Sequence, residues 1–115
     1  MKNKPIIIVG GEPNSIFYEI FFKSLKDNKF KSPLLLITSL KLFKAQMKKF
    51  KFKCNIKLIN IKNLDTLKSK KNINIINVNY NKFKKSKKNY IVSKVYIKEC
   101  FDVAFKLLKK KFQIN

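Results

Sequence analysis

Short runs of β-branched and other apolar residues alternate along this chain with longer segments in which apolar residues recur every three or four positions. The first run, Pro5–Gly10, reads Pro-Ile-Ile-Ile-Val-Gly and leads into a second glycine. A run that is apolar at nearly every position is typical of a strand buried on both faces of a parallel sheet, because a solvated face would show polar residues at alternate positions. The alternation of the two kinds of segment predicts an α/β protein.

The first predicted helix follows the glycines. Asn14 or Ser15 can cap it by accepting from free backbone N–H groups, and Asp27-Asn28 should end it. Its inward-facing stripe is predicted to be Ile16, Ile20, Phe21 and Leu25.

A second strand is predicted over Pro33–Ile37, and Thr38-Ser39 supplies the next cap. The helix after it should bury Leu40, Phe43, Met47 and Phe50. The segment Asn55–Ile61 partly alternates apolar and polar residues, which indicates a strand near a sheet edge, and Ile73–Val78 indicates a fourth strand whose buried face the pattern leaves open.

Residues 62–72 and 79–89 are predicted to be loops. The last helix is predicted from about Ser93 to Lys111. Its apolar stripe is wide: Ile97, Cys100, Phe101, Ala104, Phe105, Leu108 and Phe112. A helix with so wide an apolar face should lead back into the sheet that it covers. We therefore expect residues 1–115 to be the N-terminal part of one three-layer α/β/α sandwich with a mostly parallel sheet, incomplete at its C-terminal side.

The net charge of +22 favours contact with polyanions. All 28 basic residues are lysines, however, and Lys, Asn, Ile and Phe together make up 67 of the 115 residues. AT-rich codons encode these four residues, so a biased genome explains the charge without selection for a basic surface. Nucleic-acid readers favour arginine, whose planar group contacts guanine and phosphate through two hydrogen bonds. We therefore expect only nonspecific, salt-sensitive binding of nucleic acid.

Two cysteines, Cys54 and Cys100, stand far apart, and the chain has no histidine. This set has too few ligands for a zinc site, and two reduced thiols are the expected state. The longest apolar runs, Ile6–Val9 and Leu34–Ile37, are too short to cross a bilayer, so no membrane partner and a cytoplasmic location are expected.

One stretch, Gly10–Ile20, stands where the first strand turns into the first helix, the position at which α/β proteins bind ligands. It resembles the opening signature of the PdxA family of 4-hydroxythreonine-4-phosphate dehydrogenases, roughly Gly-Asp/Glu-Pro-Ala-Gly-Ile-Gly-Pro-Glu. The matching residues are Gly11, Glu12, Pro13, Ile16 and Glu19. The family has Ala, Gly, Gly and Pro where this chain has Asn14, Ser15, Phe17 and Tyr18. The later strands and helices also occur in the order that the resemblance implies.

The resemblance implies an isocitrate/isopropylmalate dehydrogenase-like fold and a homodimeric oxidoreductase of pyridoxal 5′-phosphate biosynthesis. Such an enzyme uses NAD and a divalent metal (Zn, Mg or Co) to oxidise and decarboxylate the phosphorylated substrate 4-phosphohydroxy-L-threonine. The family's metal ligands are histidines that come later in the chain, as does its Gly-Pro-x-x-Lys segment. No catalytic or metal-binding role passes to a residue of this sequence, so the 115 residues alone should be inactive and bind neither cofactor.

Glu12 and Asn14 are the candidate residues for lining a substrate cleft. Both have a structural alternative, since an acidic residue near a helix N-terminus is favoured by the helix dipole and Asn14 can act as a cap. Two other functions remain open for the whole chain. One is a small basic α/β module that binds nucleic acid or another polyanion, and the other is a non-catalytic homologue that keeps only the scaffold.

Overall fold

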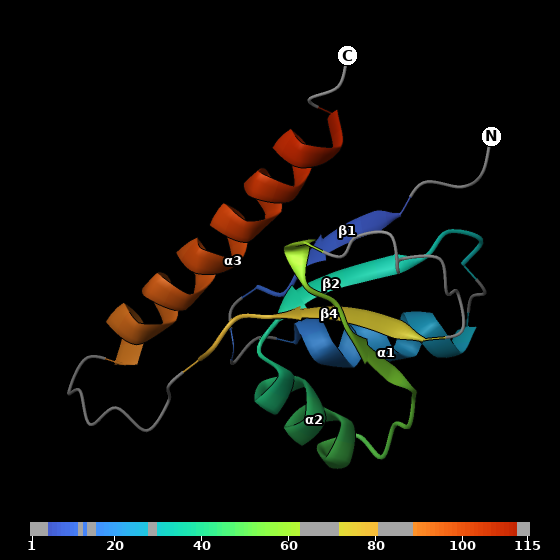
Figure 1. The fold of residues 1–115 in the computed structure, drawn as a ribbon. Coiled ribbons are helices and arrows are strands. Elements are labelled where there is room, and N and C mark those ends of the chain that lie inside the picture. The colour runs from blue at the N-terminus through green and yellow to red at the C-terminus, as the bar shows by residue number, and fades with distance from the viewer. Residues whose placement is uncertain are drawn as a thin grey trace.

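A computed structural model describes residues 5–11, 13, 16–27, 30–62, 72–80 and 89–112. These residues form four strands and three helices in the order β-α-β-α-β-β-α that the sequence predicts (Figure 1). The elements are β1 (Ile6–Val9), α1 (Phe17–Asp27), β2 (Leu34–Thr38), α2 (Leu40–Lys49), β3 (Ile56–Leu58), β4 (Ile73–Asn77) and α3 (Asn89–Phe112).

The four described strands form one sheet in the order β1-β2-β4-β3, and every neighbouring pair is parallel. In register, Ile7 lies beside Leu35, and Leu35 lies beside Asn74. The prediction of an α/β protein with a mostly parallel sheet is confirmed, and the described sheet is parallel throughout. The short strand β3 lies at an edge, as its alternating pattern indicates.

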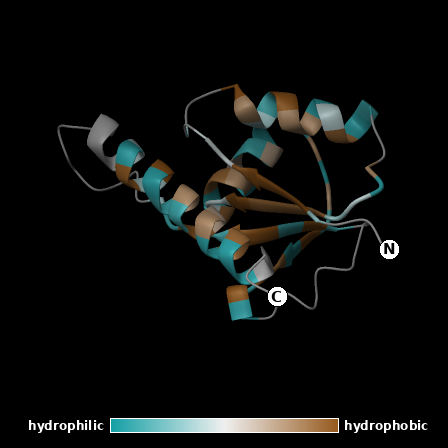
Figure 2. Ribbon diagram, turned by 90° about the horizontal axis from the view of Figure 1, so that it is seen from above, coloured by the Kyte–Doolittle hydropathy of each residue, from teal (hydrophilic) through white to brown (hydrophobic). Residues whose placement is uncertain are grey.

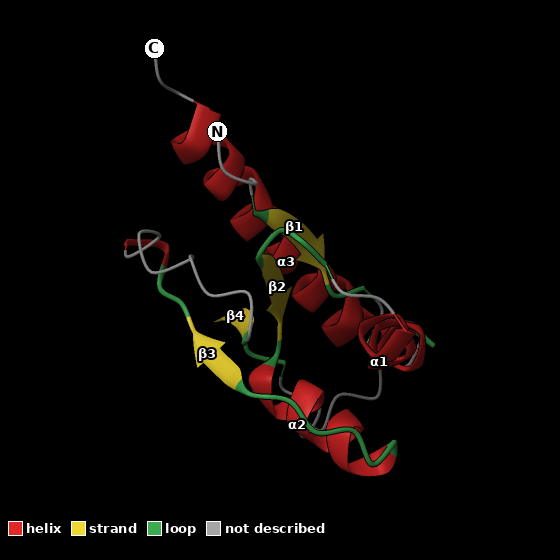
Figure 3. Cartoon of the chain, turned by 90° about the vertical axis from the view of Figure 1, so that its right-hand side faces the viewer, coloured by secondary structure: helices red, strands yellow, loops and turns green. Residues whose placement is uncertain are grey.

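Helices cover both faces of the sheet. Helices α1 and α2 pack on one face and α3 packs on the other, where it contacts β1 and β2 (Figure 3). The strands are mostly hydrophobic, with polar residues in β3 and β4 (Figure 2). Strands β2 and β4 lie between neighbours and bury almost all of their residues, which suits the nearly all-apolar sequence of β2. Strand β4 also buries a polar residue, Asn74, whose Nδ2 donates to Leu34 O.

The face beneath α1 and α2 is closed by an aromatic cluster. Phe43 of α2 is fully buried, and its ring lies 5.4 Å from that of Phe22 and 6.2 Å from that of Phe21 in edge-on contacts. Phe22 also stacks on Phe52, with ring centroids 4.7 Å apart. Such ring pairs add about 1 kcal/mol each to the free energy gained from burial alone.

The predicted inward stripe of α1 is wrong in part. Ile16 and Ile20 are 67% and 54% exposed, whereas Tyr18, Phe21 and Phe22 face the sheet. The aromatic residues bury more apolar area than the isoleucines, so the helix turns to bring them to the sheet. Leu25 packs against this core as expected.

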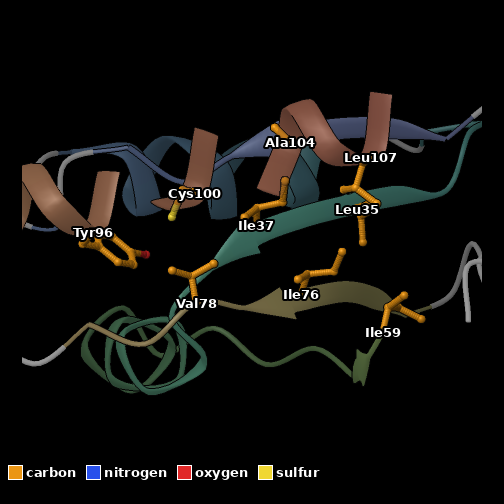
Figure 4. Packing of buried hydrophobic residues seen from close by; sticks show 9 residues of the cluster. All are labelled: Leu35, Ile37, Ile59, Ile76, Val78, Tyr96, Cys100, Ala104 and Leu107. Carbon is orange, nitrogen blue, oxygen red and sulfur yellow. The ribbon is translucent and has the colours of Figure 1, made fainter. Parts of the chain in front are cut away.

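The predicted stripe of α3 also needs correction. Tyr96, Cys100, Ala104 and Leu107 are the apolar side chains that α3 buries against the sheet (Figure 4). Phe101, Phe105 and Leu108 are exposed instead. The Tyr96 hydroxyl forms hydrogen bonds at the end of β2 and so fixes the rotation of the helix about its axis. Of the two predicted loops, residues 63–71 and 81–88 lie outside the described residues, and Asn89 is already the first residue of α3, four residues before the predicted start at Ser93.

Candidate functional site

The carboxyl ends of β1, β2 and β4 meet at one edge of the sheet. The turns that follow them begin at Gly10, Ser39 and Val78. Hydrogen bonds tie the three turns together, since Gly10 N donates to Ile37 O at 2.8 Å and Val78 N donates to Thr38 O at 3.0 Å. In open parallel sheets this edge is where ligands bind, so it is the candidate functional site.

Gly10 stands where β1 comes closest to the end of β2. A Cβ atom placed on Gly10 would lie 2.9 Å from Thr38 Oγ1 and 3.1 Å from Ile37 O. These separations are too short for a carbon atom, so any side chain at position 10 would push the loop away from β2. Gly10 therefore has a packing reason to be glycine.

Gly11 has no such reason. A Cβ atom on Gly11 would meet no atom of the described residues within 4 Å, and neither glycine has a positive φ. Pro13, two residues further on, is fully buried and anchors the turn. The candidate residues Glu12 and Asn14, and the possible cap Ser15, lie outside the described residues.

A cluster of three buried hydroxyl groups, from Tyr18, Thr38 and Tyr96, lies beneath this turn. Thr38 Oγ1 is 2.6 Å from the Tyr18 hydroxyl and 3.1 Å from the Tyr96 hydroxyl. The Tyr96 hydroxyl also accepts a hydrogen bond from Ser39 N at 2.8 Å. The hydroxyl cluster joins α1, β2 and α3 directly beneath the candidate site.

Burial keeps the groups of this cluster protonated. It raises the pKa of Tyr18 and, more strongly, that of Tyr96, where the nearby Tyr18 adds to the effect of burial. Burial also raises the pKa of the neighbouring Cys100 thiol to about 11. At neutral pH these groups are uncharged hydrogen-bonding partners, and none of them is a base or a thiolate nucleophile.

The N-terminus of α2 is satisfied by protein groups. Ser39 is its cap, as predicted, and its Oγ accepts from Leu42 N at 3.3 Å. Asn77, at the end of β4, accepts from Leu40 N at 2.8 Å through Oδ1 and donates to Asn79 Oδ1 at 3.1 Å. The N–H groups of Leu40 and Leu42 are therefore already bonded within the protein and are not free to bind an anion.

The acidic and cysteine side chains of the described residues do not gather into a metal site. Among the described residues, no group of three or more His, Cys, Asp or Glu side chains could hold a metal ion. Cys54 and Cys100 are both free thiols, as expected. No helix within the described ranges is long and apolar enough to cross a membrane.

A groove of about 460 Å³ opens on the α3 side of the sheet, away from the first turn. It runs between α3 and the ends of β3 and β4. Its lining is mostly apolar: Leu58, Ile59, Asn60, Ile61, Ile76, Asn77 and Val103. Lys110 Nζ donates to Ile61 O at 3.5 Å near the groove.

Comparison with known proteins assigns no family. No protein-family model matches the chain, and no curated protein sequence matches it.

Sequence reasoning predicted the edge of the sheet and the Ser39 cap, but it missed the hydroxyl cluster and Asn77. No sequence pattern assigns a role to Tyr18 or Tyr96. The usable signal was the polar residue at the C-terminal end of each of two strands, Thr38 after Leu34–Ile37 and Asn77 after Ile75-Ile76. A polar residue at that position faces the other turns of the edge.

Proposed function

We propose that this chain contributes the N-terminal part of a PdxA-type, NAD- and metal-dependent 4-hydroxythreonine-4-phosphate dehydrogenase. In this proposal, residues 1–115 supply the first strands of a dehydrogenase-like α/β/α sandwich and one wall of the substrate cleft. The metal ligands and the groups that take part in hydride transfer come from polypeptide outside this sequence. The support is the resemblance of Gly11–Glu19 to the family signature, together with the parallel sheet on which that stretch lies.

The observation that carries the proposal is the difference between the two glycines of the first turn. Gly10 is explained by its close approach to Thr38, whereas nothing in the described structure requires Gly11 to lack a side chain. A glycine with open space beside it, at the ligand-binding edge of a parallel sheet, suits close approach of the backbone to a bound molecule. Gly11 is also the first residue of the stretch that matches the family.

The residues present do not themselves fit a metal. The chain has no histidine, and the described residues contain no cluster of metal-binding side chains. The role proposed for this chain is therefore to form and position a wall of the cleft. The hydroxyl cluster beneath the first turn keeps that wall from shifting when substrate binds.

The proposal is tested by reading the messenger RNA beyond codon 115. We expect an open frame that encodes a Gly-Pro-x-x-Lys segment and three separated histidines. The protein made from that frame should reduce NAD in the presence of 4-phosphohydroxy-L-threonine and a divalent metal. A stop codon directly after Asn115, with a stable 115-residue protein in the cell, would contradict the proposal.

The two glycines provide matched variants for the same assay. Gly11→Val should lower kcat/KM by at least about tenfold and leave the unfolding temperature unchanged, because the new side chain would meet the ligand and none of the described residues. Gly10→Val should lower the unfolding temperature, because its side chain would collide with Thr38. Full activity in Gly11→Val would remove the main support for the proposal.

The rival function, a basic module for polyanions, has a separate measurement. Fluorescence anisotropy with a labelled oligonucleotide should show binding that disappears as salt is raised, with little preference among sequences. Tight binding of one sequence at physiological salt would favour the rival function instead.

A further inference from the structure

The two edges of the described sheet differ in chemistry. Strand β3 is three residues long and carries a lysine, Lys57, which are features that protect an edge from pairing with another strand. Strand β1 reads Ile-Ile-Ile-Val, with no charge and no proline. It has the composition of a strand with neighbours on both sides, yet among the described strands only β2 pairs with it.

The free side of β1 carries hydrogen-bonding groups in a defined order. Ile6 N donates to Pro33 O and Gly10 N donates to Ile37 O. In a parallel pair, successive residues direct their N–H and C=O groups to opposite sides, so Ile8 also faces β2. The N–H and C=O groups of Ile7 and Val9 therefore face away from β2, toward the side of β1 where no described strand lies.

Helix α3 carries exposed apolar side chains on the same side of the molecule as the free edge of β1. Phe101, Phe105 and Leu108 recur at the spacing of one helix face, and they are 46%, 58% and 40% exposed. We call these three side chains the α3 ledge. Phe101 and Phe105 contact each other, with ring centroids 6.4 Å apart.

The position of Val103 shows which way the α3 ledge faces. Val103 lines the groove beside β3 and β4. Residues two apart on a helix point about 200° apart, so Phe101 and Phe105 both face away from that groove. Because α3 lies across β1 and β2, the ledge faces outward past β1.

The path of the chain shows on which side of the sheet a strand that followed α3 would lie. Helix α3 begins near the carboxyl ends of the strands, where Tyr96 meets Thr38, and its C-terminal end lies beyond β1 (Figure 1). The connection β1-α1-β2 moves across the sheet toward β3 with its helix on one face. A connection from β4 through α3 to a strand outside β1 moves the opposite way with its helix on the other face. The second connection differs from the first in both the direction along the sheet and the face that its helix covers. These two reversals cancel, so both connections have the same handedness, the right-handed form that parallel sheets adopt.

We propose that the free edge of β1 and the α3 ledge together form the acceptor site for a fifth strand. The occupant is an uncharged, β-branched segment of about five residues, supplied by polypeptide on the C-terminal side of α3 and running parallel to β1. It accepts from and donates to Ile7 and Val9, and its side chains on the α3 face cover Phe101 and Phe105. This inference does not depend on the reaction proposed above.

The test adds a strand to the full chain. A linker of about six residues and the segment Ile-Val-Ile-Val-Thr are fused after Asn115, and a control fusion carries Ser-Gly-Ser-Gly-Ser in the same place. Hydrogen exchange should slow by at least about tenfold at the Ile7 and Val9 amides in the strand fusion, and stay unchanged in the control. Binding of the dye ANS, a measure of exposed apolar surface, should fall in the strand fusion only.

Two results would overturn the proposal. One is equal exchange at Ile7 and Val9 in both fusions. The other is a dimer of the unfused chain in which these two amides are already protected, since that would identify a second copy as the occupant. A double variant that combines the strand fusion with Phe105→Ser should lose part of the gain in protection. Leu58→Ser, at an equally exposed leucine of β3, should leave the gain intact.

Discussion

The two faces of the sheet are closed in different ways. On one face, α1 and α2 meet through a cluster of phenylalanine rings centred on Phe22 and Phe43. On the other face, a single helix is fixed by hydrogen bonds at one end and buries smaller side chains, such as Cys100 and Ala104, along its length. The first face derives its stability from aromatic packing. The second depends on a few polar contacts and still leaves apolar surface uncovered on α3.

Removing the central ring of the aromatic face should have the largest effect. Phe43 is fully buried, so Phe43→Ala should lower the free energy of unfolding by about 4 kcal/mol through lost burial and the cavity left behind. Urea unfolding followed by circular dichroism measures this value. A loss below about 1 kcal/mol would show that the aromatic face is not the main source of stability.

Removing the Tyr96 hydroxyl, which holds α3 on the other face, should cause the second largest loss of stability. Tyr96→Phe removes the hydroxyl that contacts Thr38 and Ser39 N, and it leaves that N–H buried without its partner. We expect a loss of about 2 kcal/mol. Faster hydrogen exchange along α3 than along α2 would place the loss on this face, and equal acceleration in both helices would contradict the difference between the faces.

The pH dependence of the free energy of unfolding should further distinguish the face covered by α3 from the face covered by α1 and α2. Burial raises the pKa of Cys100 to about 11, while the unfolded thiol ionises near 9, so the stability that this group contributes is complete below pH 9 and is lost as the pH rises toward 11. The loss at pH 10 should be about 1 kcal/mol. Because the lysines titrate in the same range, the measurement is the difference in urea unfolding between pH 8 and pH 10 for the wild type and for Cys100→Ala. The change in the free energy of unfolding between pH 8 and pH 10 should differ between the wild type and Cys100→Ala. Identical changes in the two proteins would contradict a buried, neutral thiol.

The smallest effect is expected at the α3 ledge. Phe105 is the exposed counterpart of Phe43, and Phe105→Ala should change the free energy of unfolding by no more than about 0.5 kcal/mol in the unfused chain. The pair Phe43→Ala and Phe105→Ala therefore compares one side chain in two surroundings by the same urea titration. A large loss at Phe105 would mean that the ledge is already covered.

Most of the fold follows from local pattern. The run Leu34–Ile37 is apolar because a parallel strand between two neighbours is buried on both faces, and this rule needs no knowledge of the tertiary structure. Ile6–Val9 is equally apolar but only partly buried, with Ile6 43% exposed, and the run Ile73–Ile76 is interrupted by the buried Asn74. Helix rotation was harder to predict, because α1 and α3 each carry more apolar residues than one face can bury. In α1 the aromatic residues displaced Ile16 and Ile20.

The site was predictable only in its location. The first turn lies at the carboxyl edge as expected, but Tyr18, Thr38 and Tyr96 come together from positions 20 and 58 residues apart along the chain. No periodicity relates residues so distant, since their contact depends on how α1 and α3 pack on opposite faces. The assignment to the PdxA family is a proposal that rests on five matching residues between Gly11 and Glu19, on the parallel sheet and on the open space beside Gly11.

The hydroxyl cluster joins residues that lie far apart in the sequence, and this affects how the protein folds during its synthesis. The rings that join α1 to α2 all lie between Phe17 and Phe52, so they can meet early, while the ribosome is still adding the rest of the chain. Tyr96 cannot reach Thr38 until α3 has emerged. We therefore expect the nascent chain to spend part of its synthesis with one side of its sheet bare, and to depend on chaperones during that interval.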